Sequence, residues 1–194
     1  MNPTTHPDFE SIVLSEAEIQ AHIETLATKL NEDYANKTPV LLAVLKGVYP
    51  FLSDLAKKLS FYCDIEFIAA SSYHGGTATT DWVEIYLWPR MSLKGKDVLI
   101  IEDIIDSGLT LKKIKQKVQS EGASSVKLVT LLDKPSGRKT KLEADYVGTT
   151  VKPLFLVGYG LDFQEKYRNV PFVGVLKKEI INMNAKDYPW RNNQ

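Results

Sequence analysis

The chain has 194 residues, which suits one domain, and its 24 lysines and arginines balance its 24 aspartates and glutamates. Without a net positive charge there is no global field to attract nucleic acid or an anionic membrane, so a charged ligand must be recognised locally. The single cysteine, Cys63, cannot form an internal disulfide, and no uncharged apolar run approaches the roughly 18 residues that span a bilayer, so we expect a cytoplasmic protein without membrane or nucleic-acid partners.

The N-terminal part of the sequence predicts a helix, a strand and a second helix. Ser15 and Glu18 form a capping-box pattern, and apolar residues follow at helical spacing, which predicts an amphipathic helix over residues 16–34. The apolar run over residues 39–45 predicts a buried strand. After a turn, apolar residues recur at helical spacing over residues 51–59 and predict the second helix.

The next segment has the pattern of a β-hairpin. Residues 64–73 and 82–88 are rich in apolar and aromatic residues and predict two strands. The sequence between them is small, polar and glycine-bearing, so we expect a mobile loop over residues 71–81.

A strand, turn, helix and strand follow in the clearest order of the whole sequence. Residues 97–101 predict a buried strand and residues 103–110 a turn, after which an apolar stripe at helical spacing continues to the stop signal at Gly122. A strand over residues 126–132 completes a βαβ crossover and hence a parallel pair. Three further strands are predicted, over residues 145–151, 154–162 and 172–176.

Charged residues mark the ends of several predicted strands. They are Lys46, Asp103, Asp106, Lys134 and Asp162. Because the carboxyl ends of parallel strands line the ligand crevice of an open sheet, we expect these charged side chains to share one cleft.

The turn from Asp106 to Thr110 has the composition of a small phosphate cradle. It lacks the lysine of a nucleotide P-loop, but its backbone N–H groups, the Ser107 and Thr110 hydroxyls and the helix N-terminus can bind a monophosphate, while Gly108 allows close approach. An ordinary helix cap without a ligand is the alternative for this turn taken alone.

Two carboxylates precede this turn and change its interpretation. Glu102 and Asp103 repel phosphate, but carboxylates accept hydrogen bonds from a vicinal diol and help to hold hydrated Mg²⁺. A ligand with a phosphate at one end and a ribose diol beside it satisfies both features.

The segment "VLIIEDIIDSGLT" resembles the phosphoribosyl-diphosphate motif of the phosphoribosyltransferases. Its flanks narrow the resemblance to the hypoxanthine-guanine phosphoribosyltransferases, because the supporting segments occur in the order found in that family. These segments are "LAVLKGVYPF", "SSYHGG", "LLDKPSGRK" and "LFLVGYGLDFQEKYRNVPFVGVL", and the resemblance covers about residues 10 to 180.

The resemblance implies a site for phosphoribosyl diphosphate. Glu102 and Asp103 would hold the ribose hydroxyls. The 5′-phosphate would lie on the turn formed by Asp106, Ser107, Gly108, Leu109 and Thr110. The pyrophosphate would meet residues from three segments, namely Lys46 and Gly47, Ser72 and Tyr73 of the closing loop, and Arg168. The family also often has a non-proline cis peptide in the loop that follows the first core strand.

The resemblance also implies a site for the base and the metal. Lys134 would donate to the 6-oxo group of a purine, Phe155 would stack on the ring, and the backbone of Leu156 and Asp162 would read its other edge. Asp106 would serve purine N7 as the general base or acid. Mg²⁺ would be organised by Glu102, Asp103 and Asp162.

These inferences predict an α/β protein with the type I phosphoribosyltransferase fold. We expect a single domain, residues 1–194, with a central, mainly parallel sheet flanked by helices and a small hood built from the N-terminal region and about residues 150–194. The expected reaction transfers the 5-phosphoribosyl group from 5-phospho-α-D-ribosyl 1-diphosphate to hypoxanthine or guanine, giving IMP or GMP plus pyrophosphate, in a homodimer or homotetramer.

Two alternatives stay open at this stage. One is a phosphoribosyltransferase that prefers xanthine, and the other is a non-catalytic regulator that senses phosphoribosyl diphosphate. Three departures from the family pattern, at Leu109, at the aromatic segment 82–88 and at Lys152-Pro153, bear on loop closure, packing and base preference.

Overall fold

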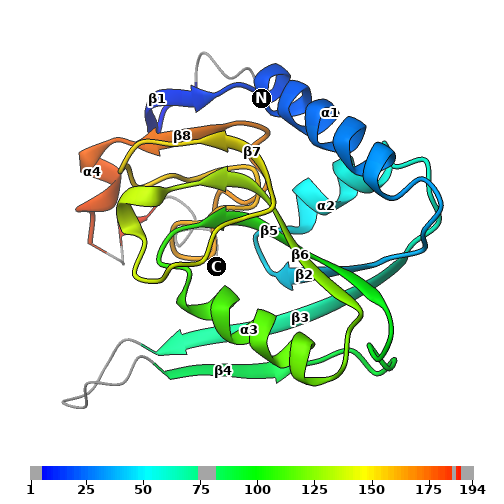
Figure 1. The fold of residues 1–194 in the computed structure, drawn as a ribbon. Coiled ribbons are helices and arrows are strands. Elements are labelled where there is room, and N and C mark those ends of the chain that lie inside the picture. The colour runs from blue at the N-terminus through cyan, green and yellow to red at the C-terminus, as the bar shows by residue number, and fades with distance from the viewer. Residues whose placement is uncertain (1–5, 74–81, 185–186, 189–194) are drawn as a thin grey trace. The chain divides into compact units, whose positions relative to one another are not determined.

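The computed structural model describes residues 6–73, 82–184, 187 and 188 (Figure 1). The chain divides into two compact units, the smaller from residues 1–19 and 154–194 and the larger from residues 20–153. The predicted single domain with its hood stays a prediction. No helix within these described ranges is both long and apolar enough to cross a membrane.

The larger unit contains a six-stranded, mainly parallel sheet with the strand order β4-β3-β2-β5-β6-β7. Its strands are β2 (Val40–Leu45), β3 (Asp64–Tyr73), β4 (Trp82–Leu87), β5 (Asp97–Ile105), β6 (Ser125–Asp133) and β7 (Tyr146–Thr150). All neighbouring pairs are parallel except β3 and β4, which form the predicted antiparallel hairpin. The sheet confirms the predicted α/β class.

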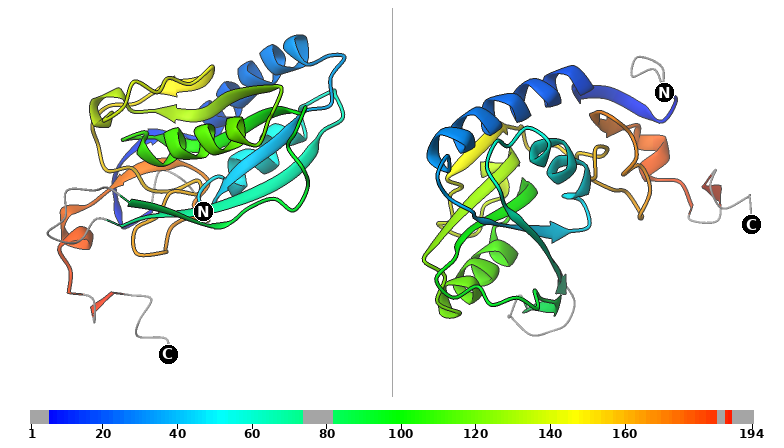
Figure 2. Two further views of the ribbon diagram at one scale, coloured as in Figure 1. Left: turned by 60° about the horizontal axis from the view of Figure 1, so that its bottom comes forward. Right: turned by 90° about the vertical axis from the view of Figure 1, so that its right-hand side faces the viewer.

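Helices cover both faces of this sheet, as Figures 1 and 2 show for the larger unit. Helix α3 (Leu109–Ser120) buries Leu111, Ile114 and Val118 against alternate residues of β2 and β5. Helices α1 (Glu16–Asp33) and α2 (Tyr49–Ala56) lie on the opposite face. The two faces follow from the strand repeat, since successive side chains point to opposite sides. Strand β2 is therefore apolar throughout and β5 is apolar over residues 98–101, as the sequence indicated.

The capping signals of the sequence are confirmed. The Ser15 backbone N–H donates to the Glu18 carboxylate at 2.8 Å, and the Glu18 N–H donates back to the Ser15 hydroxyl at 3.3 Å. Gly122, with φ of +83°, follows the end of α3 as predicted. The second predicted helix is shorter than expected, because α2 ends at Ala56 rather than near residue 59.

The smaller unit contains the strands β1 (Phe9–Leu14) and β8 (Val173–Leu176), which pair antiparallel, and the short helix α4 (Lys178–Ile181). Its core is aromatic and apolar, with Phe9, Val157, Tyr167, Val170, Phe172, Leu176 and Ile180 packed together. The first strand was not predicted from sequence, since it pairs only with a segment more than 150 residues away.

Two further predictions, one strand and the end of another, were wrong. The predicted strand over 154–162 is instead a set of isolated bridges and turns, because Gly158, Tyr159 and Gly160 all have left-handed backbone, with φ of +102°, +49° and +97°. The strand predicted over 97–101 continues to Ile105, so Asp103 lies inside β5 and not in the turn after it. In the hairpin, residues 71–73 belong to β3, and 74–81 of the predicted loop lie outside the described residues.

Candidate active site

Three of the predicted charged residues lie at one edge of the larger unit's sheet. Lys46 follows β2, Asp106 follows β5 and Lys134 follows β6, and these three strands are parallel neighbours. A pocket of about 240 Å³ opens at this edge. It is lined by Val44, Leu45, Ala70, Glu102, Ile104, Asp106, Ser107, Gly108, Thr110 and Leu111. The sheet thus brings the predicted sugar and phosphate residues together.

The predicted phosphate turn is built around Gly108. Its φ of +75° starts helix α3 from a left-handed residue, and a Cβ there would lie 2.7 Å from the Thr140 hydroxyl. Ser107 Oγ accepts from the Leu109 N–H at 3.4 Å. Ser107, Gly108 and Thr110 line the pocket at the first turn of the helix, where backbone N–H groups lack intrahelical partners. This arrangement suits an anion such as phosphate.

The acidic pair at the end of β5 lies beside the same pocket. Asp103 is buried, and its Oδ1 accepts from the Ile104 N–H at 2.7 Å, while its own N–H donates to Glu102 Oε1 at 3.3 Å. Burial, and after it the negative charge of Asp103, raises the pKa of Glu102 well above the usual value of a glutamate. A ligand that brings hydroxyl donors or a cation stabilises the charged form of Glu102 against both its burial and the charge of Asp103.

Asp106 and Lys134 form an ion pair across two loops. Lys134 Nζ lies 2.9 Å from Asp106 Oδ2, and the lysine side chain is only 18% exposed while the aspartate side chain is 51% exposed. The carboxylate rests on the backbone of Gly137, where a Cβ would lie 1.6 Å from Asp106 Oδ1. The pair therefore presents a donor and a carboxylate side by side at the sheet edge.

The loop after β2 carries the non-proline cis peptide that the resemblance implied. It is the bond between Leu45 and Lys46. Leu45 lines the pocket. Ser72 and Tyr73 have described backbone in β3, paired with Val83 and Trp82 of β4, but their side chains lie outside what the structure describes.

The remaining predicted site residues belong to the smaller unit. Arg168 Nη2 lies 2.8 Å from Asp162 Oδ1, and Nη1 donates to the Gly160 carbonyl at 2.8 Å. Phe155 is 52% exposed, whereas Leu156 is buried. The Asp162–Arg168 ion pair was not foreseen from sequence, where the two residues had separate roles.

One residue of the larger unit was missed by the sequence analysis. Arg138 bonds to the backbone of both Ile105 and Asp106, although no role was assigned to it. Its place in the segment "LLDKPSGRK", four residues after Lys134, was the only available signal.

No group of three or more histidine, cysteine or acidic side chains that could hold a metal occurs among the described residues. Any divalent cation at Glu102 and Asp103 would therefore need oxygen ligands from a substrate or from water.

A mainly parallel sheet with a pocket at the carboxyl ends of its strands places the protein among the α/β proteins that bind ligands at this edge, and the turn from Ser107 to Thr110 suits a phosphorylated one. Comparison with known proteins narrows this class. Residues 11–164 match the phosphoribosyl transferase domain family, and the chain belongs to that family.

Relatives and solved structures agree with this assignment. The hypoxanthine-guanine phosphoribosyltransferase of Bacillus subtilis is 46% identical over 173 residues, which cover 89% of this chain and 96% of that protein. A crystal structure of a hypoxanthine phosphoribosyltransferase from Staphylococcus aureus superposes with a TM-score of 0.88 at 44% identity, covering 95% of this chain and 100% of the other. The predicted family and type I fold are confirmed.

A longer relative is also similar. The bifunctional protein TilS/HprT of Listeria monocytogenes is 46% identical over 179 residues, and the match covers 92% of this chain but 28% of that protein. The chain thus spans less than a third of the length of this relative.

Proposed function

We propose that the protein transfers the 5-phosphoribosyl group from 5-phospho-α-D-ribosyl 1-diphosphate to N9 of hypoxanthine or guanine, releasing pyrophosphate and giving IMP or GMP. Relatives named as hypoxanthine-guanine phosphoribosyltransferases at 44 to 46% identity support this activity. The observation that carries the choice of base is the Lys134–Asp106 pair. With its proton on N7, a 6-oxopurine presents the O6 acceptor beside the N7–H donor on one edge, which a neighbouring ammonium and carboxylate can serve together.

The base would displace the Lys134–Asp106 contact. Lys134 would turn its ammonium to purine O6, which accepts only, and this donor is mismatched to the amino group of adenine. Asp106 would then take up the N7 proton as the bond from N9 to C1 of the ribose forms and the bond from C1 to the pyrophosphate oxygen breaks, and it would return the proton in the reverse reaction. In the smaller unit, Phe155 would stack on the base, and the backbone of Leu156 and Asp162 would read its other edge.

The sugar diphosphate would use the rest of the site. Ser107, Gly108, Leu109 and Thr110 would hold the 5′-phosphate, Glu102 and Asp103 the ribose hydroxyls, and Lys46, Gly47, Ser72, Tyr73 and Arg168 the pyrophosphate. The 240 Å³ pocket supports this division, because Glu102 lines it together with Ser107, Gly108 and Thr110 of the phosphate turn. The proposed closure, which would exclude water that could hydrolyse the substrate, falls on residues 71–81, of which 74–81 lie outside the described residues.

The acidic pair fits Mg²⁺ as a cofactor. The raised pKa of Glu102 reflects burial beside Asp103, so a cation there offsets unfavourable negative charge. When bound, Mg²⁺ would neutralise charge on the departing pyrophosphate. Glu102 and Asp103, with Asp162, would orient it, and because two adjacent carboxylates make an incomplete ligand set, the metal would arrive largely with the diphosphate.

A turnover assay with four bases tests the activity. We expect product from hypoxanthine and guanine with Mg²⁺, little from adenine, and no turnover in excess chelator. Product from xanthine at the highest rate would favour the xanthine-preferring alternative. Binding of phosphoribosyl diphosphate with no turnover of any base would favour the regulator.

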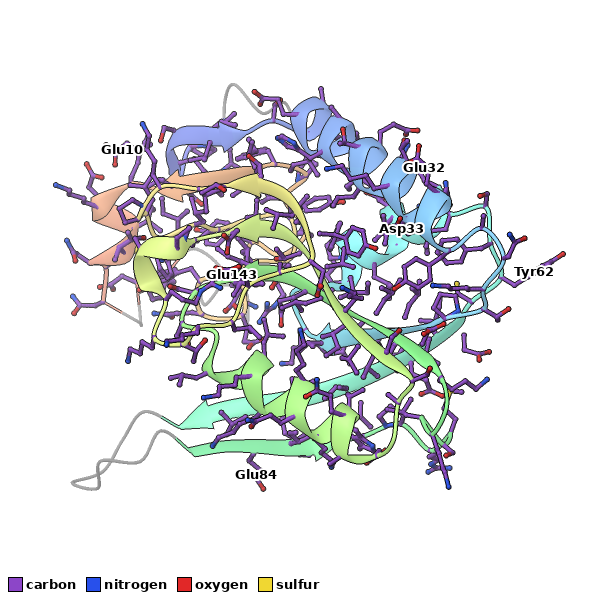
Figure 3. All side chains as sticks on the ribbon, in the orientation of Figure 1. Glu10, Glu32, Asp33, Tyr62, Glu84 and Glu143 are labelled. Atoms are coloured by element: carbon purple, nitrogen blue, oxygen red, sulfur yellow. The ribbon has the colours of Figure 1, made fainter. Side chains whose placement is uncertain are left out.

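We also infer a homodimer or homotetramer in the cytoplasm. The cytoplasmic location rests on the lone, free Cys63. The oligomer rests on exposed apolar side chains at the β3–β4 side of the larger unit. They are Tyr62 at 86%, Ile65 at 46%, Phe67 at 38%, Tyr86 at 62% and Leu87 at 43% exposure. Figure 3 shows Tyr62 extending away from the ribbon. Ile65 and Phe67 alternate along one face of β3, and Leu87 pairs with Ala69 of the same face. Exposed apolar side chains on one face of a sheet are typical of protein interfaces.

Light scattering during gel filtration tests the assembly. Tyr62→Asp with Phe67→Glu should shift the protein toward monomer. Glu143→Gln, in the connection between β6 and β7 (Figure 3), is the control and should leave the mass unchanged.

A further inference from the structure

Arg138 joins two loops that are far apart in the sequence. We define the catalytic turn as residues 105–108 and the base loop as residues 134–142. The Arg138 guanidinium donates to the carbonyl of Asp106 at 3.1 Å and to that of Ile105 at 3.3 Å, both in the catalytic turn. It also donates to the Leu142 carbonyl at 2.5 Å and pairs with the Asp133 carboxylate. Its side chain is 13% exposed.

The two loops also contact each other through their backbones. The Lys134 N–H donates to the Ile105 carbonyl at 3.0 Å, and the Lys139 N–H donates to the Ser107 carbonyl at 2.9 Å. A Cβ on Gly108 would lie 3.1 Å from Arg138 Cδ, so the stem of the arginine lies against the start of helix α3. The phosphate turn, Asp106 and Lys134 are therefore held as one assembly, with the Arg138 guanidinium at its centre.

We propose that Arg138 is a positioning residue that fixes Asp106 and Lys134 relative to each other and to the phosphate turn. This role rests on the proposed function, because it matters only if Asp106 and Lys134 meet the same purine. The partners of the guanidinium named above are protein atoms, so it acts through Asp106 and does not need to touch the substrate.

An arginine suits this role better than a lysine. Its planar guanidinium supplies five donors in a fixed fork, which serve three carbonyls and a carboxylate at once. An ammonium on a flexible stem cannot reach all of them in one geometry. Replacing the arginine removes the guanidinium donor from the carbonyls of Asp106 and Leu142 and loosens the position of Asp106, whereas the Ile105 carbonyl keeps the Lys134 N–H.

Three variants test the proposal, with the parent protein assayed alongside. Arg138→Met removes all the side-chain donors, and Arg138→Lys keeps the positive charge. Lys139→Met is the control, because this substitution removes a positive charge from an exposed side chain of the same loop. Arg138→Met should lower kcat by about 10- to 100-fold, since a displacement near 1 Å in a catalytic group costs up to about 10²-fold. KM for phosphoribosyl diphosphate should stay within about threefold, Arg138→Lys should be intermediate, and the control should match the parent.

A double-mutant comparison separates positioning from general support of the fold. If Arg138 acts through the Asp106 carboxylate, Arg138→Met in an Asp106→Asn background should cost less than about threefold further in kcat. An equal loss in both backgrounds would overturn the positioning role.

The outcomes distinguish this inference from the proposed function. Turnover by the parent with unchanged kcat in Arg138→Met overturns the positioning role alone. No turnover by the parent overturns the proposed function and this role with it. If Arg138→Met shows no cooperative thermal unfolding, Arg138→Lys decides, and a kcat equal to that of the parent overturns the inference.

Discussion

The carboxylates at the two ends of the segment from Glu102 to Asp106 have opposite electrostatic surroundings. At its start, Glu102 and Asp103 lie together, and burial with like charge raises the pKa of Glu102. At its end, Asp106 meets the ammonium of Lys134 at 2.9 Å. The fold therefore disfavours the negative charge of Glu102, whereas it pairs the negative charge of Asp106, four positions later, with a lysine.

This difference teaches how each end would respond to a ligand. Hydroxyl donors or a cation at Glu102 and Asp103 offset the unfavourable burial of negative charge there, so this offset adds to the affinity of the ligand. A purine at Asp106 must replace a contact that already exists, and it succeeds only if it offers an acceptor to the Lys134 ammonium and a donor to the Asp106 carboxylate. The first end should therefore contribute affinity and the second selectivity, which the following variants examine.

The largest expected effect is that of Asp106→Asn. Asparagine keeps the shape but cannot take up the proton, so kcat should fall by about 10²- to 10⁴-fold, the usual contribution of general acid–base catalysis. Phosphoribosyl diphosphate should still bind, which titration calorimetry with the variant checks. An unchanged kcat would remove the catalytic role from Asp106.

Gly137→Ala should disturb the same carboxylate without changing its chemistry. The added Cβ would lie 1.6 Å from Asp106 Oδ1, so the carboxylate must move. Because misplacement of a catalytic group by about 1 Å costs up to about 10²-fold, kcat should fall by up to that factor. Ser136→Ala, one residue earlier in the same turn, is the matched control and should retain the parent rate.

Lys134→Met tests selectivity at the paired end. A charged hydrogen bond to a ligand is worth about 1.5 to 3 kcal/mol, so affinity for hypoxanthine and guanine should fall roughly ten- to a hundredfold. Affinity for phosphoribosyl diphosphate should be nearly unchanged. Equal purine affinity in variant and parent would contradict the assignment, and an equal loss for both substrates would indicate damaged folding.

Glu102→Gln should have the smallest effect on function, and it should make the folded protein more stable. With the pKa of Glu102 raised in the folded protein, its contribution to stability is present below the ordinary glutamate pKa of about 4.3 and is lost as pH rises through the raised value. The amide avoids that loss, so the free energy of unfolding should exceed that of the parent by about 0.5 to 2 kcal/mol in mildly alkaline buffer.

The gain from Glu102→Gln should shrink in acid. Urea unfolding at about pH 5 and about pH 8 measures both values, since the first lies near the ordinary glutamate range and the second well above it. Affinity for phosphoribosyl diphosphate should fall by about three- to tenfold, through loss of one hydrogen-bond acceptor. A Glu102→Gln variant less stable than the parent at the higher pH would contradict the conclusion that the fold disfavours the charge of Glu102.

Sequence patterns predicted the parts of the fold that depend on local signals. The capping box at Ser15, the apolar stripe of α3 and the β5–α3–β6 crossover each follow from residues close together in the chain. The end of β5 was placed too early, because Glu102 and Asp103 look like a turn although parallel pairing with β6 extends through them. Asp103 was therefore expected after the strand and lies within it.

What could not be predicted depends on contacts between distant segments. The left-handed backbone at Tyr159 follows from packing in the smaller unit and has no marker in its own sequence. Arg138 was overlooked because its partners Ile105 and Asp106 lie more than 30 residues away. The resemblance identified Asp106 and Lys134 separately, whereas their direct contact is a result of the structure.

The pairing of β1 with β8 has a consequence for synthesis on the ribosome. Phe9 pairs with Leu176, so the first strand to emerge waits for the last one. At about 5 to 20 residues per second, that interval is roughly 8 to 33 seconds, long enough for the six-stranded sheet of residues 20–153 to be complete beforehand. During this time β1 is an unpaired strand on a nascent chain. A nascent chain from which residue 150 has emerged and residue 173 has not can therefore hold its complete sheet while its first strand has no partner.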